Sequence, residues 1–325
     1  MKRGRACGLA LACLAIGAAM FAQPAQAEYP ERPIRLVVPT GAGGITDILA
    51  RILGERLGAR LGQPIVIENK PGGAGVIGSQ SVASAKPDGY TLLMAFPSHV
   101  ANPSTLKSLP YDTATDFAPI AKIGQVAEIV LVNKDSDMRD MQALAGKARQ
   151  SPDAIAYGSV GAGSLGDVCT RVFQTQAGVE MLPVAFKSEP DMLLALLRND
   201  IQVAFTSPPA AIPMIKSGKV RALAISSAER FPSLPDIPTI AQSGFPGYDV
   251  TGWNAIFAPK GTPPQIIARL NQAINAVLAE PAVAGKFVEL GVPPLGGSPE
   301  TLQASVVRDI GMIKKLLDDS GYVPQ

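Results

Sequence analysis

Histidine and cysteine are scarce in this 325-residue sequence. His99 is the only histidine and no H-E-x-x-H motif occurs, so we expect no zinc centre. Of the three cysteines, Cys7 and Cys13 lie within the first 27 residues, and Cys169 stands alone in the remainder. Without those first residues, Cys169 has no partner for an intramolecular disulfide. Its place on the apolar stripe of a predicted helix favours a packed, unreactive thiol.

Motifs of hydrolases and nucleotide-binding enzymes are absent or weak. No G-x-S-x-G elbow could hold a serine nucleophile, and no G-x-x-x-x-G-K-[ST] loop could bind a nucleoside triphosphate. Gly73 and Gly161 each begin a G-x-G-x-x-G pattern, but neither is followed by a clear acidic residue at the end of the next strand. We expect His99 to be a loop residue rather than a catalytic base. The sequence therefore predicts no cofactor and no catalytic activity.

The charge of the sequence is nearly balanced, with 29 basic and 27 acidic residues. Lys2, Arg3 and Arg5 lie in the first 27 residues, which leaves 26 basic and 27 acidic residues in the remainder. No basic run or stripe of alternating aromatic and basic residues occurs. Nucleic acid is therefore not expected as a partner.

The first 27 residues have the layout of a secretory signal peptide. A positive start is followed by the apolar run ACGLALACLAIGAAMFA and by the small residues Ala25-Gln26-Ala27, a cleavage site before Glu28. The apolar core is shorter than the roughly 18 residues of a membrane span, which makes a retained anchor the weaker alternative. We expect the mature protein, residues 28–325, to be exported to the periplasm.

Apolar runs alternate with amphipathic helical patterns through the mature sequence. Short continuous apolar runs suit strands that are buried on both faces. Clear examples are IRLVV, PIVIE, YTLLMAF, EIVLV, LPVAF and IQVAF. Between them, one helical stripe ends at Gly62 and another, which includes Val168 and Phe173, ends near Gly178. This alternation predicts an α/β architecture with mainly parallel sheets.

The chain is expected to cross twice between two lobes. One crossing is predicted around Lys122–Glu128, and the other in a stretch rich in proline and glycine, residues 231–250. Lobe 1 would then be discontinuous, with residues 28–127 and 234–325, and lobe 2 would contain residues 128–233. The long helical patterns of the C-terminal third are expected to pack on lobe 1.

Two glycine-rich segments, GAGGITD (41–47) and GAGSLGD (161–167), resemble each other. Each follows a predicted strand and begins a predicted helix, and one falls in each predicted lobe. Backbone N–H groups in such a turn, together with the helix dipole, form a site for an anion. Ligands of α/β sheets lie at the carboxyl ends of the strands, where both segments fall. Ordinary βα turns with capping residues are the alternative.

Polar side chains near the two segments have open interpretations. Serines that follow predicted strands could donate hydroxyl hydrogens: Ser98, Ser159, Ser164 and Ser207. Asp167 fits the S-x-x-D capping pattern with Ser164, and capping is our first interpretation of it. The alternative, for Asp167 and for Asp47, is a carboxylate that pairs with an amine or hydroxyl of a ligand. Trp253 could line a cleft or pack in the core.

Six blocks in order resemble the Bug-type periplasmic solute receptors, the substrate-binding components of tripartite tricarboxylate transporters. The resemblance covers essentially all of residues 28–325. The blocks are YPERPIRLVVPTGAGGITDILAR, GQPIVIENKPGGAGVIGSQSVASAKPDGYTLL, NPSTLKSLPYDTATDFAPI, YGSVGAGS, LPDIPTIAQSGFPGYDV and APKGTPPQIIARLNQAIN.

The resemblance implies a two-lobed, type II periplasmic-binding-protein fold that closes on a small carboxylate. It also implies that amides, hydroxyls and water bind the carboxylate, and that the receptor delivers it to membrane transporter subunits. We expect the receptor to be monomeric. The expected ligand-binding residues are Thr40, Ala42, Gly43, Gly44, Asp47, Ser98, Ser159, Val160, Gly161, Gly163, Ser164, Asp167 and Ser207.

Some positions depart from the family pattern and leave the ligand open. The family often has an aromatic residue in place of Thr40, proline in place of Gly41, histidine in place of Asp167 and aspartate in place of Ser207. The usual V-P-Y-K-G block reads PVAFKSE here. We expect a mono- or dicarboxylate, with an amine or an aromatic ring as options.

Two other functions stay open at this point. One is an exported enzyme acting on a small carboxylate, with Asp47, Asp167 or His99 as its base. The other is a receptor that presents its ligand to a sensor.

Overall fold

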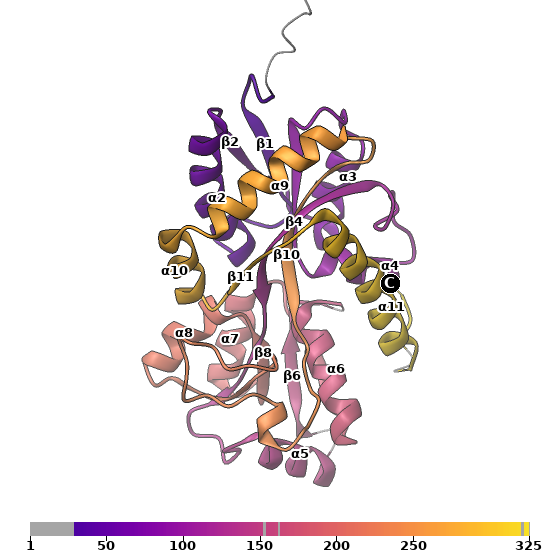
Figure 1. The fold of residues 1–325 in the computed structure, drawn as a ribbon. Helices are drawn as coiled ribbons and strands as arrows, with labels where there is room; N and C mark the ends of the chain where they lie inside the picture. The colour runs from indigo at the N-terminus through magenta and orange to yellow at the C-terminus, as the bar shows by residue number, and fades with distance from the viewer. Residues whose placement is uncertain (1–28, 152–153, 162, 320–321, 325) are drawn as a thin grey trace, which may run out of the picture. The chain divides into compact units, whose positions relative to one another are not determined.

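Two β-sheets with flanking helices make up residues 32–325, which form a single unit (Figure 1). The structure is a computed structural model that describes residues 29–151, 154–161, 163–319 and 322–324. The predicted signal peptide lies outside these residues. Within the described ranges, no helix is both long enough and apolar enough to cross a membrane.

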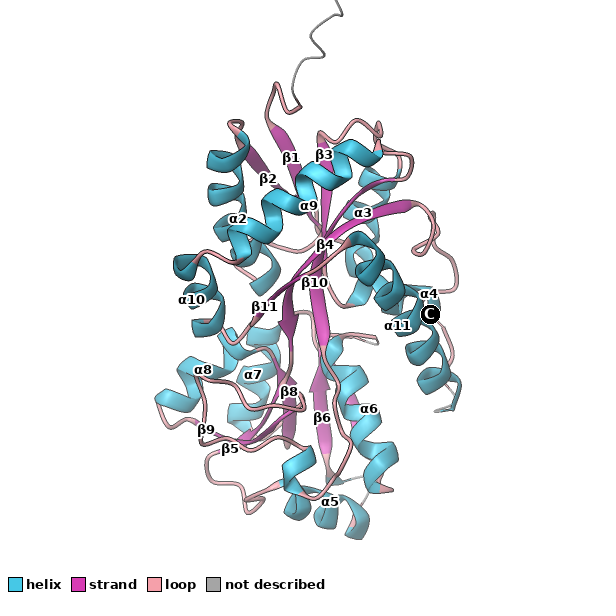
Figure 2. Cartoon of the chain, in the orientation of Figure 1, coloured by secondary structure: helices cyan, strands magenta, loops and turns pink. Residues whose placement is uncertain are grey.

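The first sheet has the strand order β11-β4-β10-β3-β1-β2 (Figure 2). Its strands are β1 (Ile34–Val38), β2 (Ile65–Asn69), β3 (Thr91–Ala95), β4 (Phe117–Val126), β10 (Gly252–Pro259) and β11 (Pro294–Gly296). β1 pairs in parallel with β2 and β3. β10 is antiparallel to β3 and β4, and β11 is antiparallel to β4.

The second sheet has the strand order β7-β6-β8-β5-β9. Its strands are β5 (Ile129–Asn133), β6 (Ala156–Ser159), β7 (Leu182–Ala185), β8 (Val203–Thr206) and β9 (Val220–Ile225). β6 pairs in parallel with β7 and β8, whereas β5 is antiparallel to β8 and β9. In each sheet four strands share one direction, whereas β5 in the second sheet and β10 and β11 in the first run the opposite way, so both sheets are mixed. β5 and β10 each enter their sheet directly from the other sheet. The predicted α/β class is confirmed.

Helices flank both sheets. Those beside the first sheet are α2 (Ile45–Leu61), α3 (Val76–Ala83), α4 (Ser98–Thr105), α9 (Pro264–Leu278), α10 (Pro281–Glu289) and α11 (Pro299–Asp319). Those beside the second sheet are α5 (Met141–Gln150), α6 (Leu165–Ala177), α7 (Glu189–Arg198) and α8 (Pro208–Lys216). The predicted stops are confirmed, because α2 and α6 end at Gly62 and Gly178 with φ of 72° and 62°, where glycine is favoured. As expected, α9 and α11 contact the first sheet at β4.

The chain crosses between the sheets at two adjacent points. Ala127 and Glu128 connect β4 to β5, within the stretch that the sequence predicted. The return is later than the Pro/Gly-rich pattern alone suggests. The last residues before it pack in the core of the second sheet: Ile240, Phe245, Tyr248 and Val250. β10 then begins at Gly252, which is the register partner of Val126 in β4. The residue at which each lobe ends stays a prediction.

Ser226, at the end of β9, connects the two crossings. Its buried hydroxyl accepts a hydrogen bond from the N–H of Glu128 at 2.8 Å and donates one to the carbonyl of Val250 at 2.7 Å. The backbone N–H of Ser226 donates to the Glu128 carbonyl, and the Val250 N–H donates to the Ser226 carbonyl, both at 2.9 Å. Four hydrogen bonds therefore hold the crossing segments beside each other.

Candidate functional site

A cavity of about 720 Å³ lies between elements of the two sheets. The side of the first sheet contributes the loop from Thr40 to Gly44, the first turn of α2 and the segment Phe96–Ser98. The side of the second sheet contributes Ser164 and Leu165 at the start of α6 and the segment Lys187–Pro190. The cavity thus opens at the carboxyl ends of β1, β3 and β6, as expected for ligand sites in α/β folds.

The predicted ligand-binding residues fall into two groups. Eight of them line the cavity: Thr40, Ala42, Gly43, Gly44, Ser98, Val160, Ser164 and Ser207. The other five lie outside its lining: Asp47, Ser159, Gly161, Gly163 and Asp167. Both aspartates are almost fully buried, each with 2% of its surface exposed. Contact with a ligand stays a prediction for every residue of both groups.

Asp47 closes the loop between β1 and α2. Its Oδ2 accepts the Gly43 N–H and the Arg51 Nε–H, both at 2.9 Å, and its Oδ1 accepts from Asn69 Nδ2 at 3.0 Å. Asn69 also donates to the Thr40 carbonyl at 3.1 Å. Burial raises the pKa of Asp47, but the hydrogen bonds from Arg51, Gly43 and Asn69 outweigh it and hold the pKa below its usual value. Asp47 therefore fixes the shape of the glycine loop from outside the lining of the cavity.

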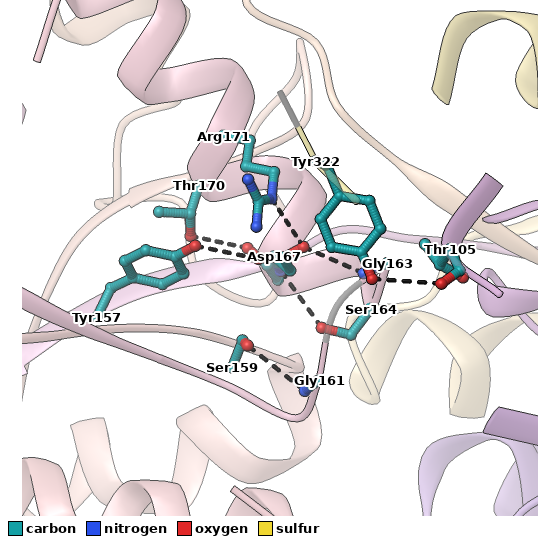
Figure 3. A network of polar contacts seen from close by, with 11 residues as sticks. Thr105, Tyr157, Ser159, Gly161, Gly163, Ser164, Asp167, Thr170, Arg171 and Tyr322 are labelled. Atoms are coloured by element: carbon teal, nitrogen blue, oxygen red, sulfur yellow. Dashed lines mark hydrogen bonds and ion pairs between the residues drawn. The ribbon is translucent and has the colours of Figure 1, made fainter. Parts of the chain in front are cut away.

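Asp167 does the same for the loop between β6 and α6 (Figure 3). Its Oδ2 accepts the Gly163 N–H at 3.1 Å and the Arg171 Nε–H at 3.0 Å. Its Oδ1 accepts from the Tyr157 hydroxyl at 3.0 Å, and burial together with the Asp167 carboxylate raises the pKa of Tyr157. The predicted cap forms, because Ser164 Oγ accepts the Asp167 N–H at 3.3 Å. The Asp167 side chain, however, bonds to Gly163 rather than back to Ser164.

The two helices that begin at these loops differ in how they are capped. Ser164 caps α6 with its side chain, whereas Gly44 at the start of α2 supplies no side-chain cap. Gly44, Ile45 and Thr46 line the cavity. The first-turn N–H groups of α2 thus lie at the cavity with no side-chain cap from the part of the chain that the structure describes, which is the arrangement of an anion site.

Gly163 brings the second loop against the first sheet's α4. Its φ of 74° lies in the left-handed region, and a Cβ at this position would overlap Thr105 Cγ2 and lie 3.3 Å from Ala101 Cβ. Only glycine therefore allows the α6 loop to approach α4 this closely. Tyr322 also contacts both elements. Its hydroxyl donates to the Thr105 carbonyl at 3.3 Å, and Arg171 of α6 lies over its ring (Figure 3).

A family model described as "Tripartite tricarboxylate transporter family receptor" matches residues 49–320. The chain belongs to this family. It is 34% identical to Protein BugT of Bordetella pertussis over 305 residues, which cover 93% of this chain and 94% of BugT. The family is one of solute-binding receptors, so the receptor is a binding protein and not an enzyme.

Two solved structures extend the similarity to the fold. The structure of R. palustris Rpa4515 with adipate matches with a TM-score of 0.85 and 36% identity, and covers 92% of this chain and 100% of that chain. The structure of the periplasmic binding protein BugD matches with a TM-score of 0.81 and 34% identity, and covers 91% of this chain and 100% of that chain. The receptor therefore has the fold of periplasmic binding proteins.

The cavity of the receptor also contains residues that the sequence did not single out as ligand-binding. They are Phe96, Glu128, Lys187, Glu189 and Asn254. Glu128 was visible only as the end of a predicted crossing and the first letter of the strand-like run EIVLV, and Asn254 only as the first letter of the later run NAIFAP. Glu189 stood in PVAFKSE, where the sequence departs from the family pattern. That departure was the one available signal.

Ser207 has a different partner from the expected one. Its hydroxyl donates to Glu189 Oε2 at 2.9 Å, and its backbone N–H donates to Glu189 Oε1 at 2.9 Å. Its hydroxyl hydrogen is therefore directed at a protein carboxylate. Ser159 is buried, and its Oγ accepts the Gly161 N–H at 3.4 Å, behind the lining of the cavity.

Three residues of uncertain role in the sequence now have defined places. His99 is not a loop residue, because it lies in α4, 1% exposed, against Tyr111, Phe117 and Phe257. Burial lowers the pKa of His99 to about 4, so its ring is neutral at physiological pH. Cys169 is buried, as predicted, and Trp253 packs in the core while its indole N–H donates to Asp309 at 2.7 Å.

Proposed function

We propose that this receptor captures a small carboxylate in its cavity and delivers it to a tripartite tricarboxylate-type membrane transporter. The observation that carries the proposal is the N-terminus of α2, which faces the cavity without a side-chain cap. The two oxygens of a ligand carboxylate would accept hydrogen bonds from the N–H groups of this turn, and the helix dipole would favour the negative charge of the carboxylate.

Two further features support a carboxylate at this end of the cavity. Thr40 lines the cavity, and its buried Oγ1 has no hydrogen-bond partner among the described residues, so a small rotation of this side chain would let it donate to a ligand oxygen. The relative Rpa4515, which has the same fold, was solved with adipate, a dicarboxylate. Binding would shift an equilibrium between open and closed lobes about the two crossings, and the closed form would be recognised by the transporter.

Export to the periplasm is part of the proposal. The family membership and the predicted signal peptide, which lies outside the described residues, both support it. Fractionation of cells that express the full chain, followed by mass measurement of the receptor, tests this. The expected result is a protein in the periplasmic fraction that begins at Glu28. A protein in the cytoplasmic or membrane fraction with its first residues intact would contradict it.

Thermal unfolding of residues 28–325 with a panel of carboxylates tests binding. A ligand at about 100 times its Kd stabilises the folded state by roughly 2.7 kcal/mol, which raises the Tm by a few degrees. The panel contains mono-, di- and tricarboxylates, adipate among them, with the corresponding amides as controls. No shift with any carboxylate would contradict the proposal.

An added charge tests the position of the carboxylate. Ala42 is exposed in the first loop, and Ala42→Asp would place a negative charge at the start of α2. We expect carboxylate affinity to fall about tenfold or more. Ala282→Asp is the matched control, because Ala282 is exposed in the first turn of α10, outside the lining of the cavity. Equal affinity in both variants would place the carboxylate elsewhere.

Uptake measurements test the transport role separately. Deletion of the genes for the membrane subunits should abolish uptake of the bound carboxylate while the receptor still binds it in vitro. Unchanged uptake would refute the transport role but leave the carboxylate site standing.

A further inference from the structure

Two hydrogen-bond acceptors at the cavity have no donor among the described residues. They are Oε2 of Glu128 and Oδ1 of Asn254, and both residues line the cavity. Glu128 is 6% exposed and Asn254 is fully buried. A buried acceptor without a donor costs about 1–3 kcal/mol, and more if it is charged, so such atoms mark places where a ligand supplies the missing donor.

The orientation of Asn254 is fixed by its partners. Its Nδ2 donates to the Ala95 carbonyl and to Thr46 Oγ1, both at 3.2 Å. A carbonyl can only accept, so the nitrogen must face Ala95, and the oxygen is the open atom. Since Thr46 belongs to the first turn of α2, this open acceptor lies beside the proposed carboxylate site.

The backbone of Glu128 is equally fixed. Its N–H donates to Ser226 Oγ at 2.8 Å and its carbonyl accepts the Ser226 N–H at 2.9 Å, within the first crossing. Since both backbone groups are bonded, the backbone of this residue cannot move away from the cavity without breaking the connection between the crossings. Glu128 is therefore held at the cavity wall.

A second carboxylate, that of Glu189, also lines the cavity. It accepts three hydrogen bonds, from Thr206 Oγ1 at 3.0 Å and from the N–H and hydroxyl of Ser207 at 2.9 Å each. This pattern suits a carboxylate that carries its negative charge. Burial, together with the charge of Glu189, raises the pKa of Glu128 well above its usual value.

No ion pair in the described part of the chain compensates these carboxylates. Within the described residues, neither Glu128 nor Glu189 forms an ion pair with a lysine or arginine. Lys187 lines the same cavity but is exposed and forms no ion pair with either of them. The walls therefore offer an anion site at α2 and, in the same cavity, a group of acceptors with excess negative charge.

We propose that Glu128, Asn254 and Glu189 form a subsite for an ammonium group of the ligand, whose carboxylate occupies the N-terminus of α2. This inference rests on the proposed function and narrows the ligand class to amino-substituted carboxylates. A hydroxyl group supplies one donor and no charge. An ammonium group supplies three donors and the positive charge that the two carboxylates lack.

The test compares ligands that share one chain length. Hexanoate has the carboxylate alone, adipate has a second carboxylate, and 6-aminohexanoate and norleucine have an ammonium group at the far or the near end. Titration calorimetry of the wild-type receptor should show at least one of the two amino compounds binding about tenfold more tightly than both hexanoate and adipate. This comparison requires no variant.

Glu128→Gln then tests whether the subsite causes the preference for the amino compound. Glutamine has the same shape without the charge, and its amide N–H could donate to a second carboxylate. We expect the preference for the amino compound over adipate to fall about tenfold or more. Glu289→Gln, at an exposed position at the end of α10, is the control and should leave the preference unchanged.

The possible failures are distinguishable. If hexanoate or adipate binds and neither amino compound binds more tightly, the ammonium subsite is refuted while the carboxylate receptor stands. If wild type prefers the amino compound and Glu128→Gln keeps that preference, Glu128 is not part of the subsite and the inference is overturned. If none of the four compounds binds, the inference is refuted, and the carboxylate proposal fails as well if no carboxylate of the wider panel raises the Tm.

Discussion

Asp47 and Asp167 have the same position in two different loops and share two kinds of hydrogen-bond partner. Each accepts the N–H of the glycine four residues before it and the Nε–H of the arginine four residues after it. The similarity of GAGGITD and GAGSLGD therefore extends from sequence to hydrogen bonding. In both loops the aspartate shapes the backbone, and the backbone of the first loop faces the cavity.

We expect Asp167→Asn to reduce stability without changing the order of ligand affinities. The substitution removes the charge that pairs with Arg171, which is only 18% exposed, so the free energy of unfolding should fall by about 2 kcal/mol. Asp47→Asn is the matched comparison and should cost less, because Arg51 is 53% exposed and solvated. Urea unfolding and calorimetry measure the two effects. A changed ligand order with unchanged stability would show that Asp167 contacts the ligand.

Gly163→Ala should weaken ligand binding more than Gly43→Ala. Both glycines have positive φ, so each substitution should cost about 1–2 kcal/mol in backbone strain. A Cβ at Gly43 meets open space, but one at Gly163 overlaps Thr105 and separates α6 from α4. The ratio of the two variants' Kd values measures the additional effect.

The double variant Gly163→Ala with Thr105→Ser is the control for this mechanism. Serine lacks the Cγ2 that the new Cβ would meet, so part of the lost affinity should return. No recovery would mean that strain at residue 163, and not the approach of the two elements, causes the loss.

His99 should make the receptor less stable in mild acid. Its pKa falls from 6.5 to about 4 on folding, so the unfolded chain binds a proton first. The stability from His99 is present above pH 6.5 and is lost as the pH falls towards about 4, in total about 3 kcal/mol. His99→Leu places an apolar side chain without a titratable group against the same aromatic rings, and should remove this part of the pH dependence of stability. Urea unfolding at a series of pH values checks it, and identical slopes in both proteins would refute the assignment.

Glu128 should have the opposite effect on stability. Burial and Glu189 raise its pKa on folding above 4.5, so the folded state binds the proton more tightly than the unfolded chain. Without ligand, stability is greatest below pH 4.5 and falls as the pH rises through the raised value. Glu128→Gln should remove this fall and be at least as stable as wild type at neutral pH. A less stable variant at neutral pH would mean that a bound cation already compensates Glu128.

Much of the fold could be predicted because its signals are local. The apolar runs marked the strands, and Gly62 and Gly178 ended the helices where the stripes ended. The expected burial was wrong for β2 and β7, which lie at the edges of their sheets. β4 was missed because Pro119, Lys122 and Gly124 interrupt its apolar pattern. Pairing with β10 on one side and β11 on the other forms this strand, and such long-range pairing is not visible in the segment itself.

The sequence could predict only those parts of the site that the backbone forms. The glycine pattern predicted both loops from the sequence. The first loop lines the cavity from Thr40 to Gly44, whereas the second, in the residues that the structure describes, reaches it only through Val160, Ser164 and Leu165. Glu128 and Asn254 could not be found in this way, because their significance is that one buried oxygen of each has no donor among the described residues. An unsatisfied atom is a property of three-dimensional surroundings, and so is the burial of His99 among aromatic rings.

The pairing of Val126 with Gly252 has a consequence for how such a protein can be assembled. The chain leaves the first sheet and re-enters it through neighbouring residues, so β4 and β10 are the two arms of one hairpin. Everything between them, the entire second sheet included, occupies the place of the hairpin's turn. Architecturally, the part that completes the cavity is an insert at the tip of a hairpin. It could be exchanged for a related insert while the register of the first sheet stays the same.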